Sequence, residues 1–478
     1  MPRIAWEALV FLVVSILLRA STFGDPNLHD DEIFYQTVGV AMHHGALPYV
    51  DVWDRKPWGL FFLYYLIAFL SEGPLAYQIV ATVFAAATAW VIARLADTWS
   101  RAPGGLMAGM AYLLWLERMQ GFGGQSPVFY NLFVALAALL VFRARTELRD
   151  GRVPASLPVA MLVAGTAITI KPTAVFEAAF LGLYAAVLLL GSPCPRSRAL
   201  ACIASWIAIG AAPMLAISAW YAGHGHWDIY WHAMATSNAD KAISLQSGAI
   251  RALITFMHLA PLLVTMVMSF ASLRGDARRF VRLWLVAALA GLCSVPNFYM
   301  HYSLPILVPI TAACAAFLEK RIAGPVTLAV LALFGLHDTM AFDFDHARRS
   351  RQSMEQLATA VRAHDQGPLF VFDGPPQLYT LTGHAFPTPL VFPHHLYHLI
   401  EKDVSHLSTQ AEVQRVLAQR PGVVVTAPQP RQGPVNRETH DAVQAYIRAH
   451  CRKVLETDSP QWLTSSRMQV WADCRRAD

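Results

Sequence analysis

The sequence predicts a polytopic α-helical membrane protein that ends in a small soluble α/β domain. Of the 478 residues, 55% are hydrophobic and only 14% are charged, and the mean hydropathy is +0.39. Long apolar runs fill the first part of the chain, whereas the tail is polar and rich in proline. We therefore expect a transmembrane domain over residues 1–342 and an extracytoplasmic α/β domain over residues 343–478.

A membrane-spanning helix needs about 20 mostly apolar residues, and runs of this kind predict about eleven spans. They lie near Ile4 to Ala20, Leu75 to Ala96, Gly104 to Met119, Val128 to Phe142, Pro158 to Ile170, Thr173 to Leu190, Leu200 to Tyr221, Ile250 to Leu273, Leu283 to Pro296, Ser303 to Phe317 and Pro325 to Met340. The apolar run Trp58 to Leu70 is too short to span comfortably. Its aromatic side chains favour a juxtamembrane or re-entrant helix.

Basic residues predict the orientation, because short loops rich in Lys and Arg stay in the cytoplasm. Such residues cluster in alternate loops: Arg94 and Arg101; Arg143, Arg145, Arg149 and Arg152; Arg196 and Arg198; Arg274, Arg278, Arg279 and Arg282; Lys320 and Arg321. This places the N-terminus inside, and the loop His29 to Pro57 and the tail after Ala341 outside. The net charge is only +5 and the basic residues follow the loops, so nucleic-acid binding is not indicated.

Alternating short strands and helices predict the α/β character of the tail. The expected strands are Leu369 to Phe372 and Val423 to Thr426, and the expected helices are Ser353 to His364, Ala411 to Gln419 and Glu438 to His450. Cys451 and Cys474 are the two cysteines of this region. In an oxidising compartment we expect them to pair if the fold brings their Cα atoms within roughly 7 Å.

The loop His29 to Pro57 gathers ionisable residues at the predicted membrane boundary. It opens with Asp30, Asp31 and Glu32, and apolar residues at helical spacing then predict an amphipathic helix, Glu32 to His44, lying on the membrane. One acid could simply cap this helix. The loop holds more charge than a cap requires, because it also contains Asp51, Asp54, Arg55 and Lys56. Ionisable groups at a membrane boundary are costly unless paired or used, so we expect a functional role.

Acids and bases arranged in this way suit transfer of a group from a lipid-linked phosphate donor. A carboxylate can take the proton from an attacking hydroxyl, while a Lys or Arg neutralises the departing phosphate. Lys171 lies between two apolar runs at the outer membrane edge and could bind the same phosphate, or it could merely extend its ammonium to water.

Two other patterns carry less weight. Histidines recur in one outer loop (His224, His226 and His232) and in the tail (His394, His395 and His398), but without a defined ligand set such segments are more often interfacial or surface residues than metal sites. Gly121, Gly123 and Gly124 lack a preceding strand and a following phosphate-loop lysine, so a nucleotide site is not supported.

Several segments together resemble the bacterial GT-C glycosyltransferases of the protein-mannosyltransferase and lipid A aminoarabinose transferase type. They are DDE at 30–32, GALPYVDVWDRKPWG at 45–59, TIKP at 169–172, PNFYMHYSLPILVP at 296–309 and LYTLTGHAFPTPLVFPHHL at 378–396. The resemblance implies a multi-helix bundle, juxtamembrane helices in the first outer loop and a variable outer C-terminal domain. It also implies a polyprenyl-phosphate sugar as the donor.

The family's functional residues map onto matching positions. Asp31 and Glu32 match its Asp-Glu pair, with Asp31 the expected general base. Asp54, Lys56 and Pro57 match its WDxKPP element, although Trp58 replaces the second proline and leaves the bend of the loop in doubt. His301 and Tyr302 match an HY pair that could contact phosphate or sugar, while His301 could equally serve only as a hydrogen-bonding group at a helix end.

The sequence thus predicts an inverting glycosyltransferase of the bacterial inner membrane, with its C-terminal domain in the periplasm. The expected catalytic residues are Asp31, Glu32 and Asp54, and the expected phosphate- or substrate-binding residues are Asp30, Arg55, Lys56, Lys171, His301 and Tyr302. No cofactor or metal site is expected, although dependence on a divalent metal stays open. The expected partners are membrane lipids and a lipid, glycan or protein acceptor.

Two alternatives belong to other functional classes. A transporter or flippase for lipids or sugar-lipids would place its charges near the bilayer midplane, between broken and pseudo-symmetric helices. A non-catalytic assembly partner would be indicated by loss of the Asp-Glu pair, which is intact here.

Overall fold

The computed structural model describes residues 3–237, 245–365, 367–431, 433–462 and 465–474. The chain forms two compact units. The bundle unit comprises Met1–Ala20, Ile79–Ile217 and Ser244–Phe342. The mixed unit comprises Ser21–Gln78, Ser218–Ile243 and Asp343–Asp478, so three separate stretches of the chain fold together in it.

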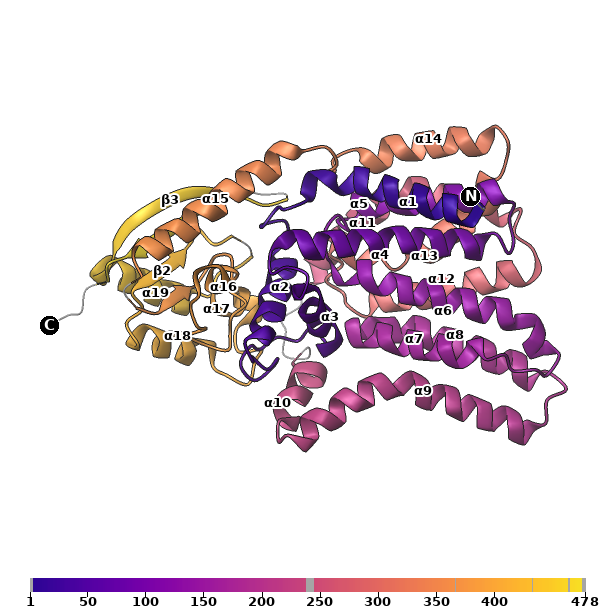
Figure 1. Ribbon diagram of the computed structural model, residues 1–478, viewed down its shortest axis with the longest axis horizontal. Helices are drawn as coiled ribbons and strands as arrows, with labels where there is room; N and C mark the ends of the chain where they lie inside the picture. The colour runs from indigo at the N-terminus through magenta and orange to yellow at the C-terminus, as the bar shows by residue number, and fades with distance from the viewer. Residues whose placement is uncertain (1–2, 238–244, 366, 432, 463–464, 475–478) are drawn as a thin grey trace. The chain divides into compact units, whose positions relative to one another are not determined.

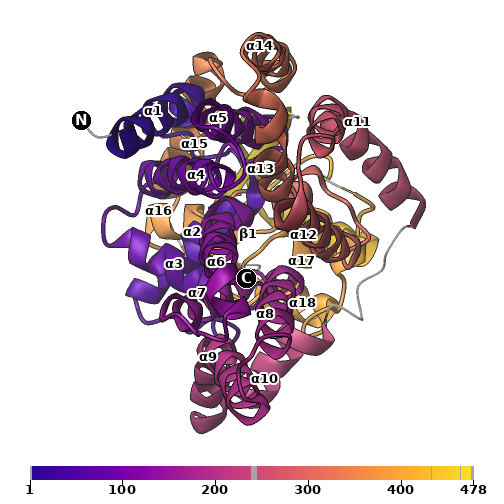
Figure 2. The ribbon, with the colours of Figure 1, turned by 90° about the vertical axis from the view of Figure 1, so that its right-hand side faces the viewer.

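Each predicted span coincides with a helix, and together these helices form the bundle unit. They are α1 (Arg3–Arg19), α4 (Pro74–Ala96), α5 (Ala102–Arg118), α6 (Ser126–Arg149), α7 (Ser156–Ile170), α8 (Val175–Leu190), α9 (Arg196–Gly223), α11 (Leu245–Phe270), α12 (Gly275–Cys293), α13 (Leu307–Leu318) and α14 (Ala323–Leu336). The helices run side by side (Figure 1) and separate clearly when viewed end-on (Figure 2). Within the described residues, six helical segments are long and apolar enough to cross a membrane, those of α1, α4, α6, α8, α9 and α11.

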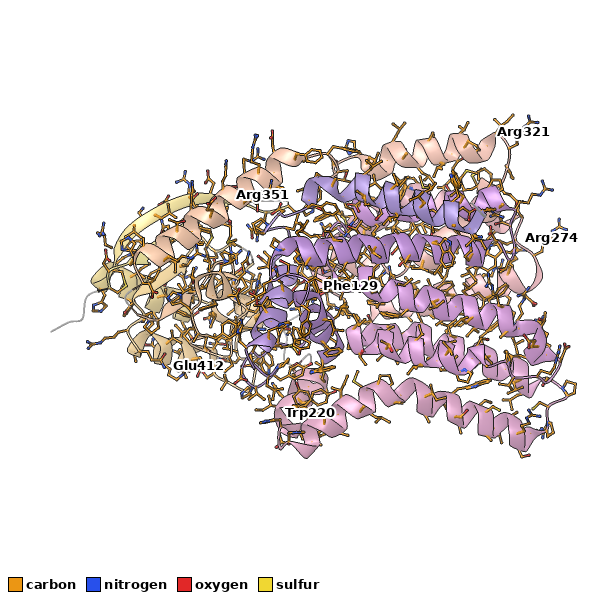
Figure 3. All side chains as sticks on the ribbon, viewed as in Figure 1. Phe129, Trp220, Arg274, Arg321, Arg351 and Glu412 are labelled. Atoms are coloured by element: carbon orange, nitrogen blue, oxygen red, sulfur yellow. A yellow bond between two sulfur atoms is a disulfide. The ribbon has the colours of Figure 1, made fainter. Side chains whose placement is uncertain are left out.

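The predicted cytoplasmic loops gather at one end of the bundle. Arg274 and Arg321, from two such loops, lie at the same end (Figure 3). Arg149 pairs there with Asp276 at 2.5 Å. The loops that carry these three arginines therefore lie at one end of the bundle, as the sequence predicts for them.

The loop between α5 and α6 is held by a buried arginine. Arg19, at the end of α1, pairs with Glu117 at 3.1 Å, and both side chains are only 1% exposed. Its guanidinium also donates to the carbonyl oxygens of Gly121 at 2.5 Å and Gly123 at 2.6 Å. A buried charge needs hydrogen-bonding partners, and the carbonyl groups of the glycine loop supply them to Arg19. The glycine loop therefore has a structural role in the bundle.

The mixed unit contains a four-stranded sheet in the order β1 (Leu369–Val371), β2 (Val423–Thr426), β4 (Ser465–Ala472) and β3 (Arg452–Pro460). The β1 and β2 strands pair in parallel, and the other two pairs are antiparallel. The expected strands are confirmed, as are the three expected helices, α15 (Phe344–Ala363), α18 (Thr409–Ala418) and α19 (Arg437–His450). The sequence analysis did not predict β3 or β4. The β3 strand is mostly polar and lacks the apolar alternation that would predict a strand.

The mixed unit also contains three short helices, α10 (Trp227–Trp231), α16 (Leu378–Thr382) and α17 (His394–Tyr397). The expected disulfide is confirmed, since Cys451 and Cys474 are bonded and their Cα atoms are 4.0 Å apart. It joins Cys451, directly after α19, to Cys474, shortly after the end of β4.

The first loop folds into α2 (Asp30–His43) and α3 (Trp58–Ala68), which pack against each other in the mixed unit. A Cβ atom on Gly39 would lie 2.7 Å from the backbone of Tyr64, so only glycine permits this approach of the two helices. The α3 helix has 11 residues and would extend about 16 Å at 1.5 Å per residue, about half of the hydrocarbon thickness. The expectation of an amphipathic helix with one buried face is wrong for α2, because ten of its 14 residues are buried.

Candidate functional site

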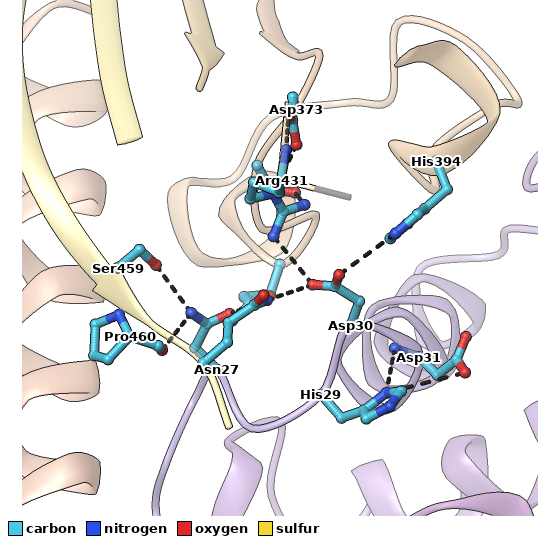
Figure 4. Close-up of polar contacts among 12 residues, drawn as sticks. Asn27, His29, Asp30, Asp31, Asp373, His394, Arg431, Ser459 and Pro460 are labelled. Carbon is cyan, nitrogen blue, oxygen red and sulfur yellow. Dashed lines mark hydrogen bonds and ion pairs between the residues drawn. The ribbon is translucent and has the colours of Figure 1, made fainter. Parts of the chain in front are cut away.

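The N-terminus of α2 carries the three consecutive acids, but none of them is its N-cap. His29 takes that position, and its Nδ1 accepts a hydrogen bond from the backbone N–H of Asp31 at 3.3 Å. The interpretation that Asp30 or Asp31 merely caps this helix is therefore wrong. Their side chains are used elsewhere, and they point in different directions (Figure 4).

Asp30 lies in a buried hydrogen-bonded network of the mixed unit. Its Oδ1 accepts hydrogen bonds from Arg431 at 3.1 Å and Gln461 at 2.6 Å. Its Oδ2 is 3.5 Å from Nε2 of His394. Burial raises the pKa of Asp30, but the charges of Arg431 and His394 outweigh burial and lower it below its ordinary value of 3.8.

The same arginine is shared with a second carboxylate. Arg431 bonds Asp373 through Nε at 2.6 Å, and both side chains are 3% exposed. Two carboxylates around one guanidinium raise the pKa of Arg431, although burial alone would lower it. This network fixes the start of α2 to the segments that follow β1 and β2.

Asp31 differs from its two neighbours in exposure. Its side chain is 24% exposed, against 7% for Asp30, and Glu32 is fully buried. Oδ1 of Asp31 lies 3.2 Å from Nζ of Lys56. Of the three acids, Asp31 is thus the one that combines access to solvent with a cationic partner. Such a carboxylate can accept a proton once its partner shifts.

Lys56 bridges two carboxylates. Its Nζ lies 3.2 Å from Asp31 and 3.2 Å from Asp54. The ammonium also lies over the rings of Phe392 at 4.5 Å and Phe34 at 5.3 Å. Burial lowers the pKa of Lys56, but the two carboxylates outweigh it and raise the pKa above 10.5, so the amine stays charged.

Asp54 is buried and each of its oxygens has a donor. Oδ1 accepts the backbone N–H of Lys56 at 3.0 Å, and Oδ2 accepts Nζ of Lys56 at 3.2 Å and Nε2 of His395 at 3.0 Å. Burial raises the pKa of Asp54, but Lys56 and His395 overcome that effect and hold it well below its usual range. These contacts suit Asp54 to holding Lys56 in place.

His395 and Glu401 extend this group. Nδ1 of His395 lies 3.6 Å from Oε2 of Glu401, and Glu401 also pairs with Arg55 at 2.6 Å. The expectation that the tail histidines are surface or interfacial residues is wrong for His395 and His398, which are 2% and 7% exposed. No sequence pattern could indicate the pairing, because His395 and Asp54 are separated by 341 residues.

Glu32 occupies the other side of α2. It is completely buried, and its charge raises the pKa of Tyr64 in addition to the larger effect of burial. A buried carboxylate next to phenol groups fits a structural role between α2 and α3 as well as a role in proton transfer.

The other predicted residues belong to the bundle unit and group with one another. Lys171 follows α7, and its Nζ lies 5.0 Å from the ring centre of Tyr302. The ring of His301 meets that of Tyr302 edge-on at 4.8 Å. Arg251 of α11, which sequence analysis did not single out, stacks its guanidinium on Tyr299 at 4.4 Å. A basic residue in an otherwise apolar helix was the signal that could have indicated it.

The predicted residues therefore form two groups, each within one unit. The mixed unit holds Asp30, Asp31, Glu32, Asp54, Arg55 and Lys56, and the bundle unit holds Lys171, His301 and Tyr302. In the mixed unit, an accessible carboxylate beside a fixed ammonium can perform proton abstraction and anion stabilisation. Across the described ranges, no group of three or more His, Cys, Asp and Glu side chains could hold a metal ion.

The fold is similar to two solved structures of ArnT. The crystal structure of ArnT from Cupriavidus metallidurans bound to undecaprenyl phosphate superposes with a TM-score of 0.64 and 12% identity, over 98% of this chain and 97% of that chain. The apo structure of the same ArnT gives a TM-score of 0.64 and 12% identity, over 97% of both chains. The chain has the fold of ArnT.

This likeness confirms the fold that the sequence resemblance predicted, a bundle of apolar helices with a small C-terminal sheet. No protein-family model matches the chain, and no curated protein matches it. At 12% identity the likeness concerns the fold, so the roles of individual residues depend on the geometry of this chain.

Proposed function

We propose that the protein is an inverting glycosyltransferase that moves a sugar from a polyprenyl-phosphate donor to a lipid, glycan or protein hydroxyl at the outer face of a bacterial inner membrane. One observation carries the proposal: Asp31, the most exposed of the three acids, lies 3.2 Å from the ammonium of Lys56 on a fold shared with ArnT. The ArnT structure with undecaprenyl phosphate supports the choice of donor.

The proposed reaction is a single displacement. The acceptor oxygen forms a bond to the anomeric carbon of the sugar while the bond from that carbon to the phosphate oxygen breaks. Asp31 takes the proton of the acceptor hydroxyl, and the polyprenyl phosphate leaves with the bonding electrons. In-line attack inverts the configuration at the anomeric carbon, and no covalent enzyme intermediate is required.

Lys56 links binding to activation in this proposal. Without donor, its ammonium is shared between Asp31 and Asp54. A donor phosphate would compete with Asp31 for the ammonium, and Asp31 would become a better proton acceptor as it loses its cationic neighbour. The cation then stabilises the negative charge that develops on the leaving phosphate.

The remaining predicted residues take supporting roles. Lys171 of the bundle unit, beside Tyr302, keeps its predicted role as a phosphate-binding residue. Arg55 pairs with Glu401 at 2.6 Å, so we assign it to positioning of the loop rather than to phosphate binding. Asp30, with its three buried partners, fixes α2.

Comparative lipid analysis tests the function directly. Membrane lipids and glycans from cells with the wild-type gene, an Asp31→Asn gene and no gene are compared by mass spectrometry. We expect a sugar-modified species that requires the wild-type gene and is absent in the other two strains, and the same strains should accumulate a glycosylated polyprenyl phosphate. Equal profiles for wild type and Asp31→Asn would exclude Asp31 as the base.

The proposed orientation has its own test. The alternation of basic loops places the N-terminus in the cytoplasm and the chain after Met340 outside. A reporter enzyme that is active only in the periplasm, fused after Met340, should therefore be active. Activity of a cytoplasmic reporter at this position would mean that Trp58 to Leu70 spans the membrane or that another predicted span does not.

A further inference from the structure

We infer that His395 and Glu401 are positioning residues that hold Lys56 between Asp31 and Asp54. The inference rests on the proposed function, because it assigns Lys56 to the phosphate of the donor. It names two residues of the C-terminal tail that act on the first loop through Asp54 and do not themselves touch the donor.

The contacts form a continuous chain. Oε2 of Glu401 lies 3.6 Å from Nδ1 of His395, whose Nε2 donates to Asp54 at 3.0 Å. Asp54 holds Lys56 at 3.2 Å, and Lys56 reaches Asp31 at 3.2 Å. Because His395 and Asp54 are each 2% exposed, water cannot readily replace either partner.

The imidazole has a definite effect on Lys56. His395 donates to Oδ2 of Asp54, and Nζ of Lys56 lies 3.2 Å from both oxygens of Asp54, so the two groups share the negative charge of one carboxylate. Without the donor His395, more of that charge would act on Lys56, and the ammonium would move toward Asp54 and away from Asp31. The amine would then be harder for a phosphate to capture, and Asp31 would lose its neighbour before the donor arrives.

Packing fixes the imidazole itself. The ring of Trp53 meets that of His395 edge-on at 5.1 Å, and Phe392 does so at 5.7 Å. Glu401 is in turn held by Arg55. Groups of this kind, one step removed from the reacting atoms, commonly change activity or affinity by about 10-fold to 100-fold when they are removed.

A double-mutant cycle on the full-length protein in detergent tests the inference, with undecaprenyl phosphate as the probe. Each of Lys56→Ala and His395→Ala should weaken binding by about 10-fold or more, and the double variant should bind no more weakly than Lys56→Ala. His346→Ala is the matched control, because His346 also pairs with a buried carboxylate, Asp25, at 2.9 Å in the same unit. It should bind as the wild type does.

A second readout does not depend on the donor. The rate at which an amine-acylating reagent modifies Lys56, followed by peptide mass spectrometry, should fall in His395→Ala and stay unchanged in His346→Ala. If His395→Ala does not elute as a folded protein, His395→Gln replaces it. A glutamine amide can still donate to Asp54, so it should restore much of the wild-type acylation rate.

The outcomes separate the two claims. Unchanged binding in Lys56→Ala, or no binding by the wild type, would overturn the proposed phosphate role, and the acylation rates would still decide whether His395 positions Lys56. Weakened binding in Lys56→Ala with additive losses in the double variant would overturn the positioning role and leave the proposed function intact. Unchanged acylation of Lys56 in His395→Ala would overturn the positioning role as well.

Discussion

Asp30 and Asp31 are neighbours in the chain and occupy opposite kinds of environment. Asp30 is almost fully buried and accepts hydrogen bonds from Arg431 and Gln461, whereas Asp31 is about a quarter exposed and faces the ammonium of Lys56. Successive residues of a helix point about 100° apart. The same first turn can therefore place one carboxylate in a rigid network and the next where a substrate could reach it.

The difference teaches how this protein uses charge. A buried ion pair is weak evidence for stability, but removing one member leaves an uncompensated buried charge and is strongly destabilising. A partly exposed carboxylate such as Asp31 costs less to change, because solvent can compensate its charge. The predictions below follow from this contrast, beginning with the largest expected effect.

Replacing the arginine of the buried network should have the largest effect. Arg431→Ala leaves Asp30 and Asp373 buried without their cation, and the free energy of unfolding should fall by about 3–5 kcal/mol. Chemical unfolding in detergent, followed by circular dichroism, measures it. Arg452→Ala is the control, because its pair with Asp473 is exposed and should contribute at most about 1 kcal/mol. Equal losses in the two variants would contradict the contrast.

The next effect concerns catalysis at the accessible carboxylate. Asp31→Asn keeps the size and hydrogen-bonding capacity of the side chain but cannot accept the proton, so turnover should fall by roughly 100-fold or more. Donor binding should change little. Asp30→Asn should lose stability instead, and the protein that remains folded should transfer sugar at a near-normal rate. Near-normal transfer by Asp31→Asn would shift the role of base to Glu32 or Asp54.

A smaller effect is expected at the cation of the bundle unit. Lys171→Ala should weaken both donor binding and turnover by about 10-fold, because a positive charge near the phosphate acts in the ground state and in the transition state. Binding and initial rates measured at several donor concentrations check this. Lys320→Ala is a matched control, since Lys320 also lies over an aromatic ring, Phe317 at 4.3 Å, but at the predicted cytoplasmic side. Equal losses would mean that the effect is structural.

The smallest expected effect is the pH dependence of stability that comes from the buried pair of His346 and Asp25. Burial lowers the pKa of His346, but the hydrogen bond and charge of Asp25 outweigh it and raise the pKa above the ordinary value of 6.5. A raised pKa in the folded state adds stability that is complete below the ordinary value and is lost as pH rises through the raised value. From about pH 5.5 to pH 8.5, the melting temperature of the wild type should fall more than that of His346→Gln. Parallel curves would show that this pair does not contribute.

Local patterns were sufficient for much of the architecture. Every predicted span corresponds to a helix because length and apolar composition decide whether a segment can cross a bilayer. The two apolar strands and three amphipathic helices of the tail are also correct, whereas β3 was missed because it is mostly polar and shows no regular apolar alternation. The first loop was predicted to hold the site because it concentrates charge where charge is costly.

The sequence by itself determined the membrane fold, the disulfide partners and the residue types of the site. Only the tertiary structure decided which acid is buried and which partners each acid has, because those partners are distant in the chain. Arg431 lies 401 residues from Asp30, and His395 lies 341 residues from Asp54. The pKa and accessibility of a carboxylate depend on burial and on the charges within a few ångströms, and these are properties of the folded chain that no spacing along the sequence contains.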